Sequence, residues 1–357
     1  MNQRLRSRLP GLKGDLMPKV LIVGQGGEYN LEGFTGNAFE ELGWVVRRFD
    51  SYLKVPRESK SAFRMLATRS SAFRKVATKV GGVQRRLEEA ISLERPDLLL
   101  VCKGELFPLQ SALNLKKLGI HSVLWYPDDP RFLKSLLLKI ASVFDLVVVS
   151  SKSTLATLHE ADMDKAIHLP FGCDPKIHRS LNVEKTMDVS FVGTWYPERS
   201  KLLSKLAKCD LRIWGAYWRT PFVARRVRRH LVSGAAYGEE YVRILNRSRI
   251  TINMHHATDS SPEGKPNMRV FEASGCGSFQ LTDSAPGLTS AFEPNKEIVC
   301  YNSPEELVDL VSYYIDAKEE RNEIARAAQH RAYAEHTYVN RVASLLTALG
   351  LPPVRSS

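Results

Sequence analysis

The sequence has few cysteines, and they form no pattern typical of a disulfide framework or a zinc site. Their number is odd, they lie far apart, and no two are separated by two residues. They are Cys102, Cys173, Cys209, Cys276 and Cys300. We therefore expect a protein of a reducing compartment, the cytoplasm, without a structural metal.

The sequence also lacks a hydrophobic run long enough to cross a membrane. The longest apolar stretch, 136–149, is interrupted by Lys139 and Asp145, which makes it too short and too charged for a bilayer. Residues 1–16 are basic but contain no apolar segment of the kind found in signal peptides. We expect them to form a basic mobile tail of a cytoplasmic protein.

Acidic residues are scarce in two segments, which carry most of the formal net charge of +12. Residues 57–86 hold nine Lys or Arg and one acid, for a net charge of +8. Residues 219–231 add five arginines and no acid. Such local charge favours an anionic partner or substrate.

The first basic segment contains a near-repeat in which Arg64 and Arg74 hold equivalent positions beside an apolar helical stripe. One interpretation is a helix packed on a sheet with a solvated basic face. The other is recruitment of an anionic acceptor, either a glycan or lipid carrier at the inner face of the membrane or an acidic protein. Arg64 and Arg74 are the acceptor-side residues of this second hypothesis.

What is present is a succession of buried strands and helices typical of an α/β protein with about two domains. The first strand, 19–23, leads into Gly24–Gly27, a helix near 35–42 and a second strand at 45–49. This opening is Rossmann-like, and we expect Gly26 and Gly27, at the ligand edge of the sheet, to lie on the acceptor side of the site. A dehydrogenase that uses these glycines and Asp50 is an alternative, but Tyr29 interrupts the spacing G-x-G-x-x-G.

A later strand–loop–helix–strand unit at 249–281 is suited to a nucleotide diphosphate. Pro266 and Asn267 predict a helix entry, where free N–H groups and the helix dipole favour phosphate. Lys265 and Arg269 add cationic donors. Glu272, at i+3 from Arg269, can accept hydrogen bonds from sugar or ribose hydroxyls. The alternative is that Arg269 and Glu272 form an ordinary surface helix pair.

Two adjacent carboxylates, Asp128 and Asp129, follow the predicted strand 122–125. Their position at the ligand edge allows either to orient or deprotonate a hydroxyl group. The alternative is a helix-capping turn.

Several motifs resemble those of the CgeB-like glycosyltransferases, the spore maturation protein CgeB and its relatives. The resemblance covers residues 96–345, and its most specific motifs lie in the second half. They are W-x-x-D-D-P from Trp125, L-P-x-G-x-D from Leu169, D-x-x-F-V-G-x-x-x-x-x-R from Asp188 to Arg199, I-x-G-x-x-W near Trp218, N-x-H at Asn253, R-x-F-E-A-x-G-C-G from Arg269, L-T-D from Leu281 and H-T-Y-x-x-R from His336.

The resemblance implies an α/β fold of two Rossmann-like domains that face each other across a cleft, the GT-B class. It implies an N-terminal acceptor domain at 17–175 and a C-terminal nucleotide-sugar domain at 188–330. A C-terminal helix at 331–350 would return to the first domain. We expect the linker between the domains at 174–187.

The implied reaction is transfer of a sugar from a nucleotide-diphosphate sugar to a hydroxyl of an acceptor, in a bacterial enzyme. The donor would contact Gly193, Arg199, Lys265, Asn267, Arg269 and Glu272, while Asp128, Asp129 and His255 would be catalytic. No metal or other cofactor is expected, because the cations and the helix N-terminus can stabilise the departing diphosphate. His255 can alternatively be a strand-end histidine bonded locally.

The resemblance also implies a retaining enzyme, with one departure. Retaining GT-B transferases carry two glutamates separated by seven residues. Glu272 matches the second, but the position of the first is Gly264, and Glu263 lies one residue away. The departure bears on the contact with the donor sugar and on the stereochemical outcome.

Two further functions compatible with the residues are a nucleotide-sugar epimerase of GT-B fold and a non-enzymatic binder of anionic surfaces or nucleic acid. Turnover of donor without an acceptor would identify the first. The second rests on the basic segments, where the aromatic residues typical of single-strand binders are few, so nucleic acid is the less favoured partner.

Overall fold

The computed structural model describes residues 17–52, 82–128, 138–255 and 266–351, which divide between two compact units. The first unit ends at Pro170 and is rejoined by the chain from Tyr338 onward. The second unit is Phe171–Thr337. Residues 171–187, which include the predicted linker, therefore lie in the second unit.

The first unit is built on a parallel sheet of six strands in the order β2-β1-β3-β4-β5-β6. The strands are β1 (Lys19–Gly24), β2 (Val45–Asp50), β3 (Leu98–Cys102), β4 (His121–Tyr126), β5 (Leu146–Val149) and β6 (Ala166–His168). The helices are α2 (Leu31–Glu41), α5 (Val83–Glu94), α6 (Leu109–Lys117), α7 (Leu138–Ala141), α8 (Lys152–His159) and α15 (Tyr338–Ala348). β3 is buried along its whole length, as parallel strands covered on both faces require.

The second unit has its own parallel sheet of six strands, in the order β12-β11-β10-β7-β8-β9. They are β7 (Met187–Val192), β8 (Leu211–Trp214), β9 (Leu231–Ser233), β10 (Ser248–Asn253), β11 (Gln280–Asp283) and β12 (Val299–Tyr301). The α-helices are α9 (Pro197–Leu203), α10 (Arg225–Arg228), α11 (Gly238–Arg247), α12 (Met268–Gly275), α13 (Pro304–Asp316) and α14 (Lys318–Glu335). Short 3-10 turns occupy Ser204–Leu206 and Pro286–Leu288. The predicted α/β class with two Rossmann-like domains is confirmed.

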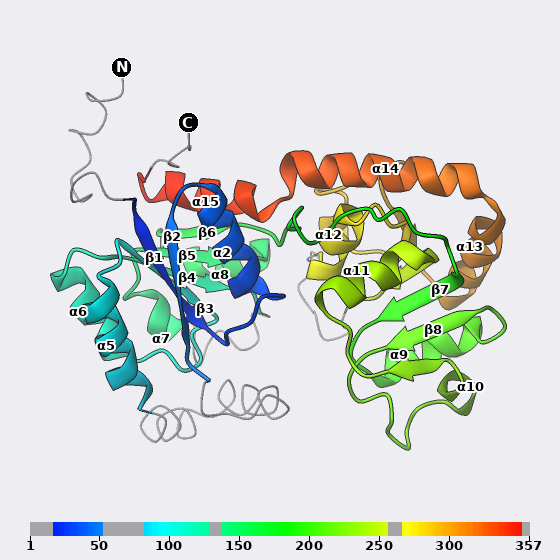
Figure 1. The fold of residues 1–357 in the computed structure, drawn as a ribbon, viewed down its shortest axis with the longest axis horizontal. Coiled ribbons are helices and arrows are strands. Elements are labelled where there is room, and N and C mark those ends of the chain that lie inside the picture. Colours follow the sequence, from blue (N-terminus) through cyan, green and yellow to red (C-terminus); the bar gives the residue numbers. More distant parts are fainter. Residues whose placement is uncertain (1–16, 53–81, 129–137, 256–265, 352–357) are drawn as a thin grey trace. The chain divides into compact units, whose positions relative to one another are not determined.

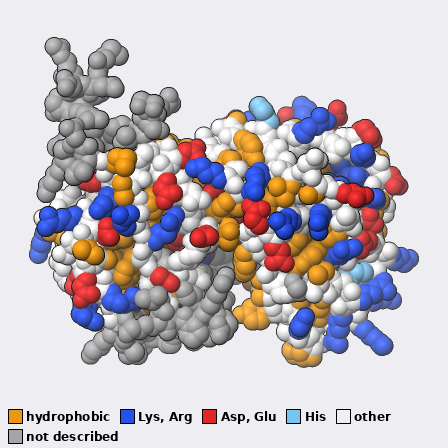
Figure 2. Space-filling view, in the orientation of Figure 1, with side chains coloured by type: hydrophobic (Ala, Val, Ile, Leu, Met, Phe, Trp, Pro, Cys, Tyr) orange, Lys and Arg blue, Asp and Glu red, His pale blue; other side chains and the backbone are white. Residues whose placement is uncertain are grey.

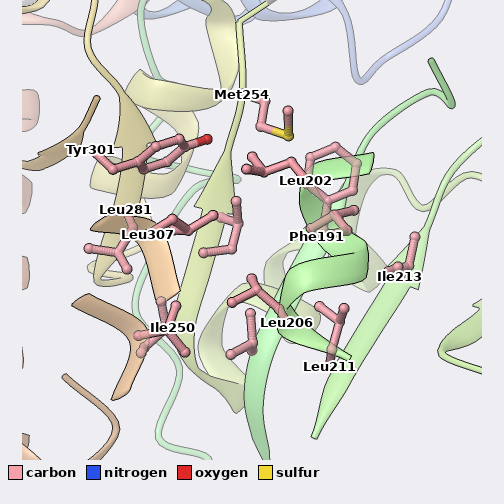
Figure 3. Close-up of a cluster of buried hydrophobic side chains, with 14 of the residues drawn as sticks. Phe191, Leu202, Leu206, Leu211, Ile213, Ile250, Met254, Leu281, Tyr301 and Leu307 are labelled. Atoms are coloured by element: carbon pink, nitrogen blue, oxygen red, sulfur yellow. The ribbon is translucent and has the colours of Figure 1, made fainter. Parts of the chain in front are cut away.

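Each unit has a hydrophobic core of its own. In the second unit, apolar side chains from the central strands pack against helices α9 and α13 (Figure 3). Phe191 and Ile250 from neighbouring strands contribute to this core, as does Leu307 from α13. Because neighbouring strands of a parallel sheet run the same way, their carboxyl ends meet at one edge. The end of β10 therefore lies between the ends of β7 and β11.

The predicted C-terminal helix at 331–350 is not continuous, because the chain breaks at His336 and Thr337 between α14 and α15. The backbone there pairs with the start of the second unit: the Cys173 N–H donates to the His336 carbonyl at 2.8 Å. The His336 ring bonds the Ala291 carbonyl, also at 2.8 Å. These contacts replace the hydrogen bonds that would continue α14. The predicted helix at 331–350 is thus shared, its first residues in the second unit and α15 in the first.

Helix α15 packs on α2 within the first unit (Figure 1). The Tyr338 ring stacks on Phe34 with 5.3 Å between ring centroids. Val342, Leu345 and Leu346 are fully buried. The Arg341 Nε donates to the Pro170 carbonyl at 3.0 Å. The last helix therefore completes the core of the first unit.

The predicted linker is ordered by contacts within the second unit. The Leu181 N–H donates to the Asn246 side chain at 2.8 Å, and the Thr186 N–H donates to the Arg247 carbonyl at 2.9 Å. Both partners belong to α11. Across the described ranges, no helix is both long enough and apolar enough to cross a membrane.

Candidate donor site

The turn after β7 begins at Gly193, which a larger residue would disturb. The Gly193 N–H donates to the Trp214 carbonyl at 2.9 Å, and its carbonyl accepts from the Trp218 indole at 2.7 Å. A Cβ at this position would lie 2.9 Å from the Phe191 ring and 3.2 Å from the Arg199 guanidinium. The glycine thus lets Arg199 pack close to the end of β7.

Arg199, on α9, joins two strand ends at the carboxyl edge of the sheet. Its two terminal nitrogens donate to the Thr194 and Met254 carbonyls, both at 2.9 Å. The guanidinium also lies over the rings of Phe191 and Tyr196, 5.5 and 5.0 Å from their centroids. A guanidinium has five N–H groups. Arg199 can therefore hold the loop and still donate to an anion.

His255 follows β10 and is held by Asp283 at the end of β11. Its backbone N–H donates to both Asp283 carboxylate oxygens, at 2.9 and 3.0 Å, and its Nδ1 lies 2.6 Å from Oδ1. The side chain is 8% exposed. Its other ring nitrogen, Nε2, has no hydrogen-bond partner among the described residues. The carboxylate fixes the ring through Nδ1, so the buried Nε2 is the ring atom left for a further hydrogen bond.

Asn267 caps the N-terminus of α12, at the helix entry that the sequence predicts. Its side-chain oxygen accepts from the Val270 N–H at 3.3 Å. Its side-chain nitrogen donates to the Asn253 side chain at 3.1 Å and to the Met254 carbonyl at 3.3 Å. Met254 therefore receives hydrogen bonds from both Arg199 and Asn267. This shared carbonyl places the start of α12 beside Arg199.

Arg269 and Glu272 form a close pair, with 2.6 Å between their side-chain atoms. Glu272 is 3% exposed, whereas the Arg269 side chain is 33% exposed. The other Glu272 oxygen lies 3.7 Å from the ring of His178, which is also buried. The Arg269 guanidinium lies over the Tyr241 ring, 4.3 Å from its centroid. Burial of Glu272 distinguishes the pair from an ordinary surface helix pair.

The cluster around Glu272 has a defined charge. Burial lowers the pKa of His178 more than the nearby Glu272 and Asp174 carboxylates raise it, so the ring is neutral at pH 7. The carboxylate therefore has Arg269 as its cationic partner. In this position Glu272 orients Arg269, and contact with a ribose stays a prediction.

The two arginines act on each other electrostatically. Burial is the largest cause of the lowered pKa of Arg199; Tyr196 and Asp283 raise this pKa, and the charge of Arg269 has a smaller, lowering effect. A site that gathers two guanidinium groups next to a helix N-terminus can neutralise a dianion. The edge formed by β7, β10 and α12 is thus chemically suited to a diphosphate.

The first unit holds the remaining predicted residues that the structure describes. Gly26 and Gly27 both have positive φ, at 73° and 113°, in the turn after β1. The Asn30 side chain donates to the Gly26 carbonyl at 2.7 Å and also caps α2 by accepting from the Gly33 N–H. The glycines are therefore required by a tight, locked turn at the carboxyl edge of the sheet.

Asp128 lies at the same edge, beyond β4, and is half-buried. Its carboxylate forms an ion pair with the Lys103 ammonium at 3.0 Å. Lys103 follows β3 and has a left-handed backbone, with φ of 68°. The conformation brings the lysine to the carboxylate, so Asp128 is anchored at the strand ends.

Several predicted residues lie outside the described ranges: Arg64, Arg74, Asp129 and Lys265. Among the described residues, no group of three or more His, Cys, Asp or Glu side chains is arranged to hold a metal ion. The sequence interpretation did not include Asp283, His178 or Lys103 in the site. Asp283 could have been inferred, since it ends a strand next to the one that precedes His255.

Three comparisons with known proteins bear on this site. Residues 199–347 match the family described as glycosyl transferase-like. The spore protein CgeB of Bacillus subtilis is 22% identical over 249 residues, which cover 65% of this chain and 76% of that protein.

Solved structures share the fold at low sequence identity. Sucrose-phosphate synthase from Thermosynechococcus elongatus has a TM-score of 0.62 at 12% identity, over 93% of this chain and 99% of that one. Anabaena HepE in complex with UDP-glucose has a TM-score of 0.61 at 13% identity, over 92% and 99% of the two chains. The resemblance that the motifs predict is confirmed by the match to CgeB, and the chain shares the fold of the GT-B glycosyltransferase structures, with two Rossmann-like domains.

Proposed function

We propose that the protein transfers a sugar from a nucleotide-diphosphate sugar to the hydroxyl group of an acceptor. The observation that carries the proposal is the placement of Arg199 and Arg269 beside the N-terminus of α12. Support also comes from HepE, which shares the fold and binds UDP-glucose. In this proposal both arginines and the first turn of α12 bind the donor diphosphate and stabilise the charge that develops as it departs.

His255 contacts the donor through Nε2 in this proposal. Asp283 bonds both the ring Nδ1 and the backbone N–H of His255. The imidazole is therefore fixed, and so is the direction of Nε2. His255→Ala should lower kcat/KM by about 10². His255→Gln, which keeps a polar side chain, should recover part of this loss. Activity of the alanine variant equal to that of the wild type would remove His255 from the site.

The diphosphate site can be tested by calorimetry with UDP, GDP, ADP and CDP, and with the nucleoside of whichever binds. Arg269→Ala should weaken diphosphate binding by about 1.5–3 kcal/mol and leave the nucleoside nearly unaffected. Arg243, exposed on α11 of the same unit, provides the control Arg243→Ala. Equal losses for diphosphate and nucleoside would contradict a phosphate role for Arg269.

The same titration separates two roles of Glu272. If its carboxylate binds the ribose, Glu272→Ala weakens the binding of the nucleoside and of the nucleoside diphosphate alike. If it acts only by orienting Arg269, the nucleoside keeps its affinity. We expect a loss of about 1.5–3 kcal/mol for the diphosphate in either case. Unchanged affinity of a folded variant would exclude Glu272 from donor binding altogether.

On the acceptor side, we propose that Asp128 orients the attacking hydroxyl and that Asp129 assists it. The ion pair with Lys103 holds the Asp128 carboxylate at the edge of the sheet, where a hydrogen bond from a hydroxyl can form. Asp128→Asn should lower kcat by about 10² without weakening donor binding. A loss of donor affinity in the same variant would contradict this role and assign Asp128 to donor binding.

We propose that the reaction needs no metal or other cofactor and proceeds with retention. Turnover should survive a chelator, and loss of turnover that manganese or magnesium restores would contradict this. NMR of the product anomer decides the stereochemistry, on which the departure at Gly264 bears. Inversion would refute retention and leave the proposed transfer itself intact.

The segment 57–86 is proposed to recruit an anionic acceptor, in the form of a glycan, lipid carrier or protein near the membrane surface. Replacement of Arg64, Arg69, Arg74 and Lys75 with glutamine should raise the KM for the acceptor and flatten its salt dependence, because exposed charges act mainly on encounter. Donor affinity should not change. A normal acceptor KM at both low and high salt would show that the segment is a solvated helix face.

A further inference from the structure

Large hydrophobic side chains are exposed together in one part of the second unit. Tyr217, Phe222, Val232 and Tyr237 are 55%, 80%, 48% and 53% exposed. The described part of the chain has ten exposed side chains of this kind, so four within 21 residues is a local concentration. Exposed apolar clusters of this type mark contact with another molecule or a membrane.

The same stretch is strongly basic. From Leu211 to Gly238 the sequence contains six arginines and no Asp or Glu. Arg219, Arg225 and Arg226 are exposed, and none forms an ion pair with a described residue. Figure 2 shows basic side chains, Lys or Arg, close to hydrophobic ones at the lower end of the unit that contains α10. We call residues 217–237 the arginine–aromatic surface.

The exposure of Phe222 is built into the fold. Arg228, on α10, donates to the carbonyls on both sides of Phe222, those of Pro221 at 2.8 Å and Val223 at 3.2 Å. Val223 and Val227 are buried in the core of the unit. The Ala224 N–H donates to the Ser200 hydroxyl at 3.0 Å. With its neighbours fixed in this way, the phenylalanine is held in solvent.

The chemistry of the surface favours one partner. An exposed apolar ring in the same short segment as three exposed arginines is complementary to a bilayer that carries anionic lipids, where the ring enters the acyl boundary and the guanidinium groups contact phosphates. A single-stranded nucleic acid would stack its bases on Tyr217, Phe222 and Tyr237, and the test below distinguishes this partner from a bilayer. An acidic protein would need an apolar pocket matched to the 80% exposed Phe222, whereas a bilayer offers acyl chains wherever the ring enters.

We propose that the arginine–aromatic surface docks on an anionic lipid bilayer, with Phe222 inserted and Arg219, Arg225 and Arg226 at the lipid phosphates. This inference does not depend on the proposed reaction or on the segment 57–86. It assigns membrane contact to a structured part of the second unit.

The test is co-sedimentation of the full chain with vesicles of phosphatidylcholine, with or without phosphatidylglycerol. The wild type should bind only when phosphatidylglycerol is present, and less at high salt. The double variant Arg225→Gln/Arg226→Gln should bind about thirtyfold more weakly, since each cation near an anionic surface contributes separately. Phe222→Ser should bind about tenfold more weakly because an inserted ring is lost.

Matched controls exclude general effects of charge and hydrophobicity. Leu93→Ser removes an 81% exposed side chain from α5 of the first unit, and Arg243→Gln/Arg247→Gln removes two exposed arginines from α11. Both should bind like the wild type. Every variant keeps the segment 57–86, and circular dichroism verifies that each is folded.

Three results would overturn the proposal. The first is vesicle binding by the surface variants that equals that of the wild type, and the second is a loss of vesicle binding in the controls as large as in the surface variants. The third is that the surface variants keep vesicle binding but lose binding to a single-stranded oligonucleotide that the wild type binds. The last result would identify the surface as a nucleic-acid site. Donor affinity measured on the same variants separates this outcome from a failure of the proposed function, since neither substitution lies among the donor-binding residues.

Discussion

At the scale of the residue, Glu272 holds Arg269 in place from inside the second unit. Glu272→Gln leaves Arg269 without its carboxylate partner and should lower the free energy of unfolding by about 3 kcal/mol. Urea denaturation measures the change. Glu239→Gln is the control, because Glu239 and Arg179 form an exposed pair at 2.8 Å that contributes less than about 1 kcal/mol. Equal losses in the free energy of unfolding for both variants would show that the buried pair contributes no more to stability than the exposed one.

His178 makes stability depend on pH in a predictable direction. Burial lowers its pKa in the folded state below the ordinary value of 6.5. The unfolded chain therefore binds a proton first as the pH falls. The contribution of this group is present above pH 6.5 and declines as the pH falls through the folded-state pKa. Denaturation over this pH range should show that the free energy of unfolding declines less steeply with falling pH for His178→Gln than for the wild type. Parallel curves would contradict this assignment.

At the scale of the element, the end of β7 and the loop after β8 are packed through two glycines. Gly215 has φ of 151°, and a Cβ there would lie 1.8 Å from the Gly193 carbonyl oxygen. Gly215→Ala must therefore displace the turn that carries Gly193. We expect a loss of about 3 kcal/mol in the free energy of unfolding.

Gly234 provides the matched control for this substitution. The two glycines are neighbours, since the Gly215 N–H donates to the Gly234 carbonyl at 3.0 Å. A Cβ at Gly234, however, would meet no atom within 4 Å. Gly234→Ala should change stability by less than about 1 kcal/mol. A Gly215 variant as stable as the Gly234 variant would show that the loop adapts freely.

At the scale of the whole molecule, each unit should respond to mutation through its own core. Leu345 on α15 is fully buried in the first unit, although it lies at the end of the chain. Leu345→Ala should cost about 3 kcal/mol and accelerate hydrogen exchange in β1 to β5. Leu307→Ala on α13, equally buried, should accelerate exchange in the strands of the second unit instead. Faster exchange in β7 to β12 of the Leu345 variant would contradict the assignment of α15.

Much of the fold was predictable because parallel strands that are covered on both faces read as short apolar runs between glycines and helices. The strands predicted at 19–23 and 122–125 are examples. The position of Asn267 was predictable for the same kind of local reason, since a cap acts on the next turn of its own helix. The break at His336 was not, because its cause is a backbone contact with Cys173, far away in sequence.

The sequence by itself determined the α/β class, the order of the strands along the chain, the local basic charge and the motifs that resemble CgeB. These depend on composition, on periodicity and on short-range spacing. Only the tertiary structure decided that Asp283 holds His255, that Glu272 is buried against Arg269 and His178, and that Arg228 exposes Phe222. Those contacts join residues across strands, helices and loops, where sequence spacing carries no information about distance.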